Sequence, residues 1–205
     1  ADAVERGDYR HYMLKEIFEQ PRAVADTLEG RLSGSRALPE AFGNDAPEIL
    51  ERVRAVKIVA CGTSFHAGSV AKYWVESLTG IPCDVEVASE YRYRKHVVPE
   101  HALFVTISQS GETADTLAAL RMAKTLGYET TLAICNVPES SLVRESDLVL
   151  LTHAGPEIGV ASTKAFTSQV IVLTLIALAL GRKGNLSSED GKLIAQELQK
   201  LPEKV

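Results

Sequence analysis

The feature that most constrains this chain is the alternation of short β-rich runs with helical stretches along its middle part. Five runs have the composition of buried strands: 56–61 (VKIVAC), 83–88 (CDVEVA), 102–107 (ALFVTI), 130–135 (TTLAIC) and 147–152 (DLVLLT). Residues 67–78 and 114–126, which lie between them, have helical spacing and stop at Gly80 and Gly127. Strand–helix–strand units in series require parallel crossovers, which place helices on both faces of a sheet. The sequence therefore predicts an α/β fold, a three-layer doubly wound domain around a five-stranded parallel sheet.

Helical patterns also flank this domain. Apolar residues recur at helical spacing before it, at Met13, Ile17, Val24, Leu28 and Leu32. Pro21 interrupts them, so a kinked or two-piece N-terminal helical extension is predicted. Residues 33–48 are rich in turn formers and indicate a loop-like connector, whereas 188–201 indicate a C-terminal helix.

The predicted organisation is a linker at 1–11, an N-terminal helix and connector at 12–50, the α/β domain at 51–184 and a C-terminal helix at 185–205. The linker begins without methionine and contains no core pattern. We therefore expect the chain to be a piece of a longer protein.

Charge and cysteine usage exclude several classes of protein. The chain has 22 basic and 27 acidic residues, and the basic ones form no dense patch, so a nucleic acid is not an expected partner. The three cysteines lack metal-binding or redox spacing and are expected to be reduced, in a cytoplasmic protein. The apolar run 170–180 is shorter than the roughly 18 to 20 residues of a membrane span, so it predicts a buried helix rather than membrane insertion.

In open parallel sheets, ligands bind at the carboxyl ends of the strands, where the strand-to-helix loops gather. That rule selects three segments: 61–64 (CGTS), 108–113 (SQSGET) and 153–163 (HAGPEIGVAST). The first two carry hydroxyl side chains beside a glycine, and each precedes a predicted helix. Two such loops at one edge indicate a single polyhydroxyl ligand.

The segment SQSGET has the parts of an anion-binding loop. A helix beginning near Thr113 exposes unpaired N–H groups, and Gly111 allows the backbone to turn close to a ligand. Ser108, Ser110 and Gln109 add neutral donors, which suffice for a phosphate monoester without lysine or arginine. The alternative is that Ser110 or Thr113 simply caps the helix.

Other chemistry is less well supported by the residues. Neither G-x-G-x-x-G nor a phosphate-binding loop with a terminal Gly-Lys-Ser/Thr is present, so no cofactor or nucleotide is expected, and no metal site is indicated. Cys61 near His66 suggests a nucleophile and base, but a thiol at the end of a buried strand is usually inert. His153 and Glu157 are expected to be a solvated loop pair, and Lys164 a surface charge at a helix start.

Together, CGTS, SQSGETADTL, AICNVP, SSLVRESD, EIGVASTKAF and YRYR (91–94) resemble the sugar isomerase (SIS) domain of the glucosamine-6-phosphate synthase family. The resemblance runs from about residue 12 to 184. SQSGET alone is typical of the broader sugar-isomerase superfamily, whereas YRYR and EIGVASTKAF are specific to the synthases.

The resemblance implies an SIS-type, flavodoxin-like subdomain, the first of two, preceded in the full enzyme by a glutaminase domain and leading through 185–205 into the second subdomain. Such an enzyme converts fructose 6-phosphate and ammonia from glutamine into glucosamine 6-phosphate, and a homodimer is expected. The family's catalytic glutamate, Schiff-base lysine and ring-opening histidine have no matching position here, so this chain alone is expected to be inactive.

The resemblance also assigns a binding role to eight positions. The sugar phosphate would be held by Ser64, Ser108, Gln109, Ser110 and Thr113. The sugar's carbon chain and hydroxyls would contact Thr63, the backbone at Val160, and Ser162.

Two alternatives remain open from the sequence. One is a stand-alone sugar-phosphate sensor, although the N-terminal helix lacks a basic DNA-recognition pattern. The other is a segment that mainly supplies a dimer surface, through apolar helices at 162–180 and 188–201 left under-covered.

Overall fold

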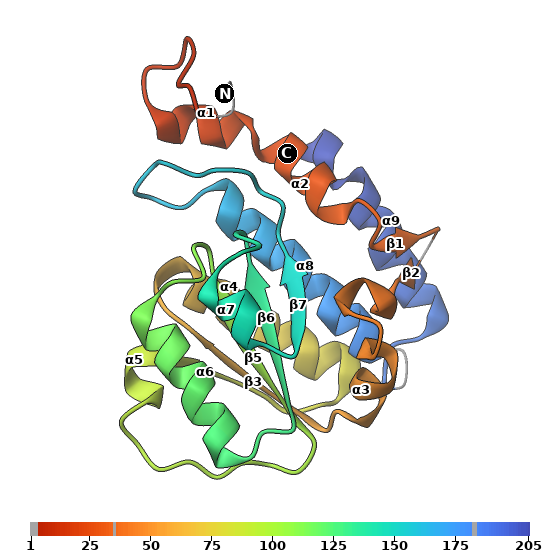
Figure 1. The fold of residues 1–205 in the computed structure, drawn as a ribbon. Coiled ribbons are helices and arrows are strands. Elements are labelled where there is room, and N and C mark those ends of the chain that lie inside the picture. Colours follow the sequence, from red (N-terminus) through yellow and green to blue (C-terminus); the bar gives the residue numbers. More distant parts are fainter. Residues whose placement is uncertain (1–3, 35, 182–183) are drawn as a thin grey trace.

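The computed structural model describes residues 4–34, 36–181 and 184–205 (Figure 1). The first three residues of the predicted linker, Ser35 of the predicted connector, and residues 182–183 of the predicted α/β domain lie outside the described residues.

A five-stranded, all-parallel sheet in the order β4-β3-β5-β6-β7 forms the centre of the molecule. Its strands are β3 (Ala55–Ala60), β4 (Cys83–Val87), β5 (Ala102–Ser108), β6 (Thr130–Cys135) and β7 (Leu148–Leu151). The five predicted strands are confirmed to within one residue at each end. Every residue of β3 and β5 is buried, as expected for central strands covered on both faces.

Helices cover both faces of the sheet, which confirms the predicted three layers (Figure 1). The longer helices are α4 (Gly62–Thr79), α6 (Ala114–Leu126), α8 (Lys164–Gly181) and α9 (Ser188–Lys204), and the shorter ones are α3 (Ala46–Arg52), α5 (Ala88–Tyr91) and α7 (Ser141–Glu145). Side chains alternate along β3, so Val56 and Ile58 pack with α4 and α8, whereas Ala55 and Val59 pack with α5, α6 and α7. The strand alternation therefore sorts the core into two separate clusters.

The N-terminal extension consists of two helices, as predicted. These are α1 (Tyr12–Phe18) and α2 (Gln20–Leu28), and they break at Glu19, directly before the turn that contains Pro21. Val24 and Leu28 on α2 are buried, with Val24 fully enclosed, but Met13 and Ile17 on α1 are exposed. Helices α2 and α9 lie side by side although they come from opposite ends of the chain (Figure 1).

The connector is more ordered than the sequence predicts. It contains a two-stranded antiparallel pair, β1 (Leu32–Ser33) with β2 (Arg36–Ala37), then the 3-10 helix η1 (Pro39–Phe42) and helix α3. Phe42 and Leu50 are buried in the core cluster that contains α8. Tertiary packing of these few apolar residues stabilises short elements in a segment whose turn formers indicate a loop.

Helix α6 departs in part from simple helical spacing, whereas α8 is buried as its apolar run predicts. On α6 the buried residues include Thr116, Ala119 and Ala123, whereas Ala114 in its first turn is exposed. Helix α8 is the one described helix that is long and apolar enough to cross a membrane, yet most of it is buried inside the protein, which is typical of a core helix. Because α2 and α4 pack against α8, the prediction that it is under-covered is wrong.

Candidate functional site

The strands end close together at one edge of the sheet. Parallel pairing aligns Ala60 with Ile107 at the ends of β3 and β5, and Cys135 with both Ser108 and Leu151 at the ends of β5, β6 and β7. The segments after β3 and β5 therefore leave the sheet as direct neighbours, and the segment after β7 lies beyond β6. The loop 108–113 is therefore the central one of the three segments at this edge.

The segment after β3 is already helical, which corrects the expectation of a loop. Helix α4 begins at Gly62, so Thr63 and Ser64 lie in its first turn, with Thr63 exposed and Ser64 buried. Among the described residues no side chain caps α4. Its first N–H groups therefore point toward the same edge as the loop after β5.

The loop after β5 is organised by one buried hydroxyl. Ser108 Oγ accepts the Gly111 N–H at 3.0 Å and lies 3.1 Å from Thr113 Oγ1. Ser110 is exposed, and its Oγ accepts the Glu112 N–H at 3.2 Å, which leaves its own O–H free to donate outward. Ser108 thus shapes the turn from inside, whereas Ser110 faces solvent at the sheet edge.

Gly111 is required for this turn on two grounds. Its φ is +69°, a conformation that favours glycine. A Cβ on this residue would also lie 2.1 Å from Ser140 Oγ and 2.8 Å from Cys135 Sγ. The loop therefore packs against the start of α7, where Leu142 N–H donates to the Gly111 carbonyl at 3.1 Å.

Helix α6 begins after Thr113, as predicted, but Thr113 does not cap it. Thr113 is the N-cap residue, and no described side chain accepts a hydrogen bond from the first turn there. Glu112, just before the helix, accepts the Ser141 N–H at 2.7 Å, and this contact lowers its pKa. The first-turn N–H groups of α6 are left available to an anion, and the helix dipole favours negative charge there.

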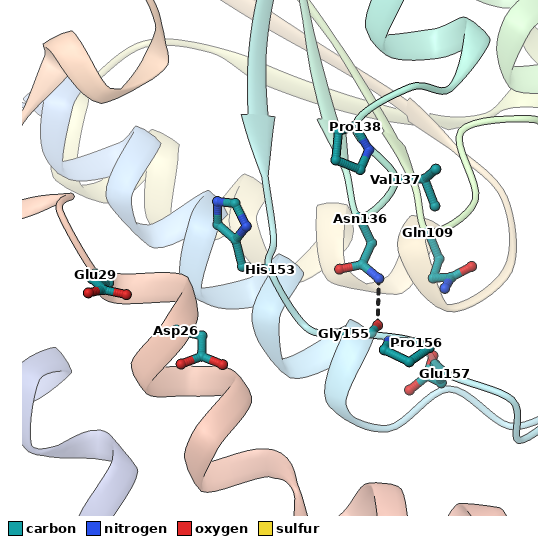
Figure 2. Close-up of a pocket in the computed structure, with 10 residues that line it drawn as sticks. All are labelled: Asp26, Glu29, Gln109, Asn136, Val137, Pro138, His153, Gly155, Pro156 and Glu157. Carbon is teal, nitrogen blue, oxygen red and sulfur yellow. Dashed lines mark hydrogen bonds between the residues drawn. The ribbon is translucent and has the colours of Figure 1, made fainter. Parts of the chain in front are cut away.

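An open cleft of about 800 Å³ lies beside this loop, between α2 and the ends of β6 and β7 (Figure 2). Gln109 lines it, together with Asn136 and His153. Asp26, Glu29 and Glu157 also line it. Three carboxylates make the cleft a poor place for a phosphate dianion, so within this edge the uncapped N-termini of α4 and α6 are the anion-favouring positions.

Asn136 links two segments that border the cleft. Its Oδ1 accepts from Thr152 Oγ1 at 2.9 Å and from the Ala154 N–H at 2.8 Å, and its Nδ2 donates to the Gly155 carbonyl at 2.7 Å (Figure 2). Asn136 has no role assigned from the sequence beyond its place in AICNVP, although its position directly after a predicted strand is a signal for one. Asn136 fixes the beginning of the segment after β7.

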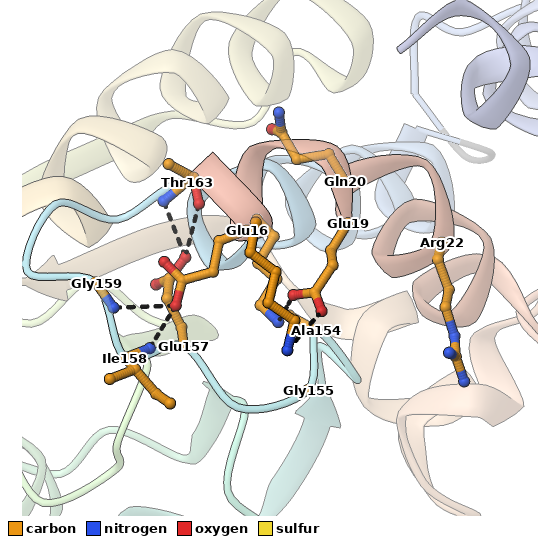
Figure 3. Close-up of polar contacts among 12 residues, drawn as sticks. Glu16, Glu19, Gln20, Arg22, Ala154, Gly155, Glu157, Ile158, Gly159 and Thr163 are labelled. Carbon is orange, nitrogen blue, oxygen red and sulfur yellow. Dashed lines mark hydrogen bonds and ion pairs between the residues drawn. The ribbon is translucent and has the colours of Figure 1, made fainter. Parts of the chain in front are cut away.

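Glu157 fixes the other end of that segment. Its Oε1 accepts from the Thr163 N–H at 2.9 Å (Figure 3). The same oxygen accepts from the Ala165 N–H at 3.2 Å, at the start of α8, and Oε2 accepts from Ser162 Oγ at 3.0 Å. Glu157 is therefore a helix cap rather than half of a solvated pair with His153. Val160 is fully exposed at the apex of the loop.

Lys164 is not the surface charge that the sequence indicates. It is only 3% exposed, and its Nζ lies 2.7 Å from Glu19 Oε2. Burial acts to raise the pKa of Glu19, but Lys164 and Lys15 outweigh it and hold that pKa below its ordinary value. The pair joins the N-terminal helices to the first turn of α8.

The remaining candidates lie elsewhere around this edge. Cys61 is half-buried at the N-cap of α4, not inside the buried strand β3, and in the described part of the chain it shares no hydrogen bond with His66. Burial, with a further contribution from Arg31, lowers the pKa of His153. In the YRYR segment, Arg94 forms a bidentate pair with Glu86 at 2.5 and 2.6 Å.

Comparison with known proteins was made for both sequence and structure. The sequence model of the SIS domain family matches residues 49–179. A glutamine–fructose-6-phosphate aminotransferase (isomerizing) of Pseudomonas syringae pv. tomato is 64% identical over 203 residues, which are 98% of this chain and 33% of that protein. The Escherichia coli K12 protein of the same name is 56% identical over 204 residues, which are 100% of this chain and 34% of that protein. The chain therefore spans about a third of the length of these relatives.

Solved structures agree with the sequence relatives. The C-terminal domain of glucosamine-fructose-6-phosphate aminotransferase from Francisella tularensis superposes with a TM-score of 0.94 at 48% identity, covering 98% of this chain and 56% of that one. Tagatose-6-phosphate ketose/aldose isomerase from E. coli, at 20% identity and a TM-score of 0.72 over 95% of this chain and 52% of that one, shares the fold alone. The family match spans more than half of this chain and includes the whole parallel sheet, and the chain therefore belongs to the SIS domain family.

Proposed function

We propose that this chain binds the phosphate of fructose 6-phosphate or glucosamine 6-phosphate at the N-terminus of α6. The observation that carries the proposal is the uncapped first turn of α6 at the centre of the sheet edge, beside the outward hydroxyl of Ser110. Neutral donors and a helix terminus can hold a monoester dianion without a lysine or arginine. In this arrangement Thr113 and Gln109 add donors from the same loop, while Ser108 holds the loop in shape.

The first turn of α4 supplies the second wall of the proposed site. Ser64 would reach the phosphate, and Thr63 the sugar hydroxyls, because the ends of β3 and β5 are paired neighbours. The backbone at Val160 and the hydroxyl of Ser162 would contact the carbon chain from the loop after β7. The cleft beside Gln109 gives this part of the ligand room.

In the parent protein, this chain would be the first SIS subdomain of a glutamine–fructose-6-phosphate aminotransferase that makes glucosamine 6-phosphate in the cytoplasm. Domain boundaries at 1–11, 12–50, 51–184 and 185–205 fit that role, with a glutaminase domain before the chain, a second SIS subdomain after it, and a homodimer as the assembly. Relatives that are 56–64% identical over nearly the whole chain favour this role over a stand-alone sensor.

The test is a titration of the chain with fructose 6-phosphate, followed calorimetrically, for the unmodified protein and for Ser110→Ala. Hydrogen bonds to charged groups contribute roughly 1.5 to 3 kcal/mol, so Ser110→Ala should weaken binding by about tenfold or more. Ser77→Ala is a matched control, since Ser77 is an exposed serine near the other end of α4. No binding by the folded, unmodified chain, or a lower melting temperature with unchanged affinity for Ser110→Ala, contradicts the proposal.

Turnover is tested separately. The chain, incubated with fructose 6-phosphate and ammonia, should give no glucosamine 6-phosphate by mass spectrometry, because the family's catalytic groups have no matching positions in it. Formation of product at a rate above the protein-free control would contradict this part of the proposal.

A further inference from the structure

The loop after β7 is long and irregular, and its apex lies away from the sheet. Residues 152–163 contain no helix or strand. Loops of this length without secondary structure are uncommon in compact domains and are usually functional. Asn136 holds the beginning of the loop and Glu157 holds its end, which leaves the apex around Gly159 to be fixed by something else.

Glu16 on α1 supplies the contact at the apex. Its Oε1 accepts the backbone N–H groups of Ile158 at 2.5 Å and Gly159 at 2.9 Å (Figure 3). Hydrogen bonds to a carboxylate are shorter and stronger than those between neutral groups. Because one oxygen takes two successive amides, it fixes the orientation of the peptide planes directly before Val160.

The approach of the loop to α1 depends on Gly159. A Cβ built on Gly159 would lie 2.5 Å from Glu16 Oε2 and 3.4 Å from the Cα of Met13. Any side chain at this position would force the Glu16 carboxylate and the loop apex apart. The missing side chain of Gly159 and the carboxylate of Glu16 are therefore parts of one contact.

Stability alone does not account for Glu16. The residue is only 2% exposed, and its Oε2 has no hydrogen-bond partner among the described residues. Burying a carboxylate that is only half satisfied costs free energy, which an apolar side chain of similar size would avoid. We therefore expect Glu16 to matter for the loop contact that it makes rather than for the stability of the core.

Helix α1 is held in place by polar contacts. Its apolar residues Ile17 and Phe18 are exposed, so core burial contributes little to its position. Directly after it, Glu19 pairs with buried Lys164 and Gln20 Oε1 accepts from Thr167 Oγ1 at 2.6 Å, both on α8. Because α8 is itself fixed in the core, α1 provides a firm support for the loop apex.

We infer that Glu16 is a positioning residue that holds the backbone at Val160 in place for contact with the carbon chain of the sugar phosphate. The inference rests on the proposed function, and it concerns only the carbon chain of the ligand. The phosphate is held by the loop after β5, which Glu16 does not touch. Loss of Glu16 should weaken recognition of the sugar and leave recognition of the phosphate unchanged.

The experiment measures the affinities of fructose 6-phosphate and of inorganic phosphate side by side, by ligand-observed ³¹P NMR on the whole chain. Glu16→Ala should lower affinity for fructose 6-phosphate by about tenfold and leave inorganic phosphate within about twofold. Glu16→Gln should lose less, since its amide oxygen can still accept both N–H groups. Gly159→Ala changes the other partner of the contact and should cause the same selective loss of affinity for fructose 6-phosphate. This variant tests the inference even if Glu16→Ala fails to fold.

Gln20→Ala is the matched control, because it removes a contact between the same helical region and α8 without touching the loop. It should lower the melting temperature with no change in the ratio of the two affinities. Hydrogen exchange at the Ile158 and Gly159 amides should accelerate in Glu16→Ala but not in Gln20→Ala.

The inference is overturned if Glu16→Ala and Gly159→Ala lose affinity equally for fructose 6-phosphate and inorganic phosphate, or if they lose no affinity for either. Binding of neither ligand by the unmodified chain overturns the proposed function, and the inference with it.

Discussion

Replacing Gly111 by alanine should destabilise the domain by about 2–5 kcal/mol. Part of this comes from the backbone, because a left-handed conformation costs a non-glycine residue about 1–2 kcal/mol and φ at Gly111 is +69°. The rest is steric, since the new Cβ would lie 2.1 Å from Ser140 Oγ and 2.8 Å from Cys135 Sγ. Overpacking of this kind typically costs about 1–3 kcal/mol.

Two variants separate the two contributions. Gly127→Ala is the backbone control, because φ at Gly127 is +90° but a Cβ there would meet nothing within 4 Å. It should cost only about 1–2 kcal/mol. In the double variant Gly111→Ala/Ser140→Gly, removing the Ser140 side chain should restore much of the steric part, because it takes away the two closest atoms.

The assay is urea unfolding followed by circular dichroism, with the free energy of unfolding extrapolated to water for all variants. The loop should also lose its function, so Gly111→Ala should bind fructose 6-phosphate more weakly wherever it remains folded. If Gly111→Ala costs no more than Gly127→Ala, the close packing of this loop against Ser140 is not real. The steric argument would also be refuted if the loss in free energy of unfolding of the double variant equalled the sum of the losses for Gly111→Ala and Ser140→Gly.

Two more perturbations test the charged contacts. Arg94 and, to a smaller extent, Lys57 hold the pKa of Glu86 at about 2, below its ordinary value of 4.5. The ionised form of Glu86 therefore stabilises the fold fully above about pH 4.5, and this stabilisation is lost as the pH falls toward 2. Urea midpoints of Glu86→Gln and the unmodified chain should therefore converge across that range, and a constant difference would contradict the assignment. Glu19→Ala should lower the free energy of unfolding by about 3 kcal/mol because it leaves Lys164 buried and unpaired. Lys164→Met should lower it less, because the remaining Glu19 is partly exposed. Thermal unfolding in which Lys164→Met is the less stable variant would contradict this.

The loop after β5 illustrates how far local sequence reasoning reaches. Strand ends and helix starts follow from residue periodicity and from glycine positions, so the helix beginning after Thr113 and the turn at Gly111 were predictable. The inward position of Ser108 and the outward position of Ser110 were not, because both are serines in the same turn and only the packed loop distinguishes them.

The sequence by itself determined the five strands, their parallel arrangement and the edge of the sheet where the hydroxyl-bearing segments gather, since each of these depends on patterns within a few neighbouring residues. Only the tertiary structure decided that Lys164 is buried, that Asn136 joins two loops, and that Glu16 supports the apex at Gly159. Glu16 and Gly159 are 143 residues apart in the chain. A contact over such a separation leaves no local periodicity, and it arises only when the core has brought α1 and the loop after β7 together.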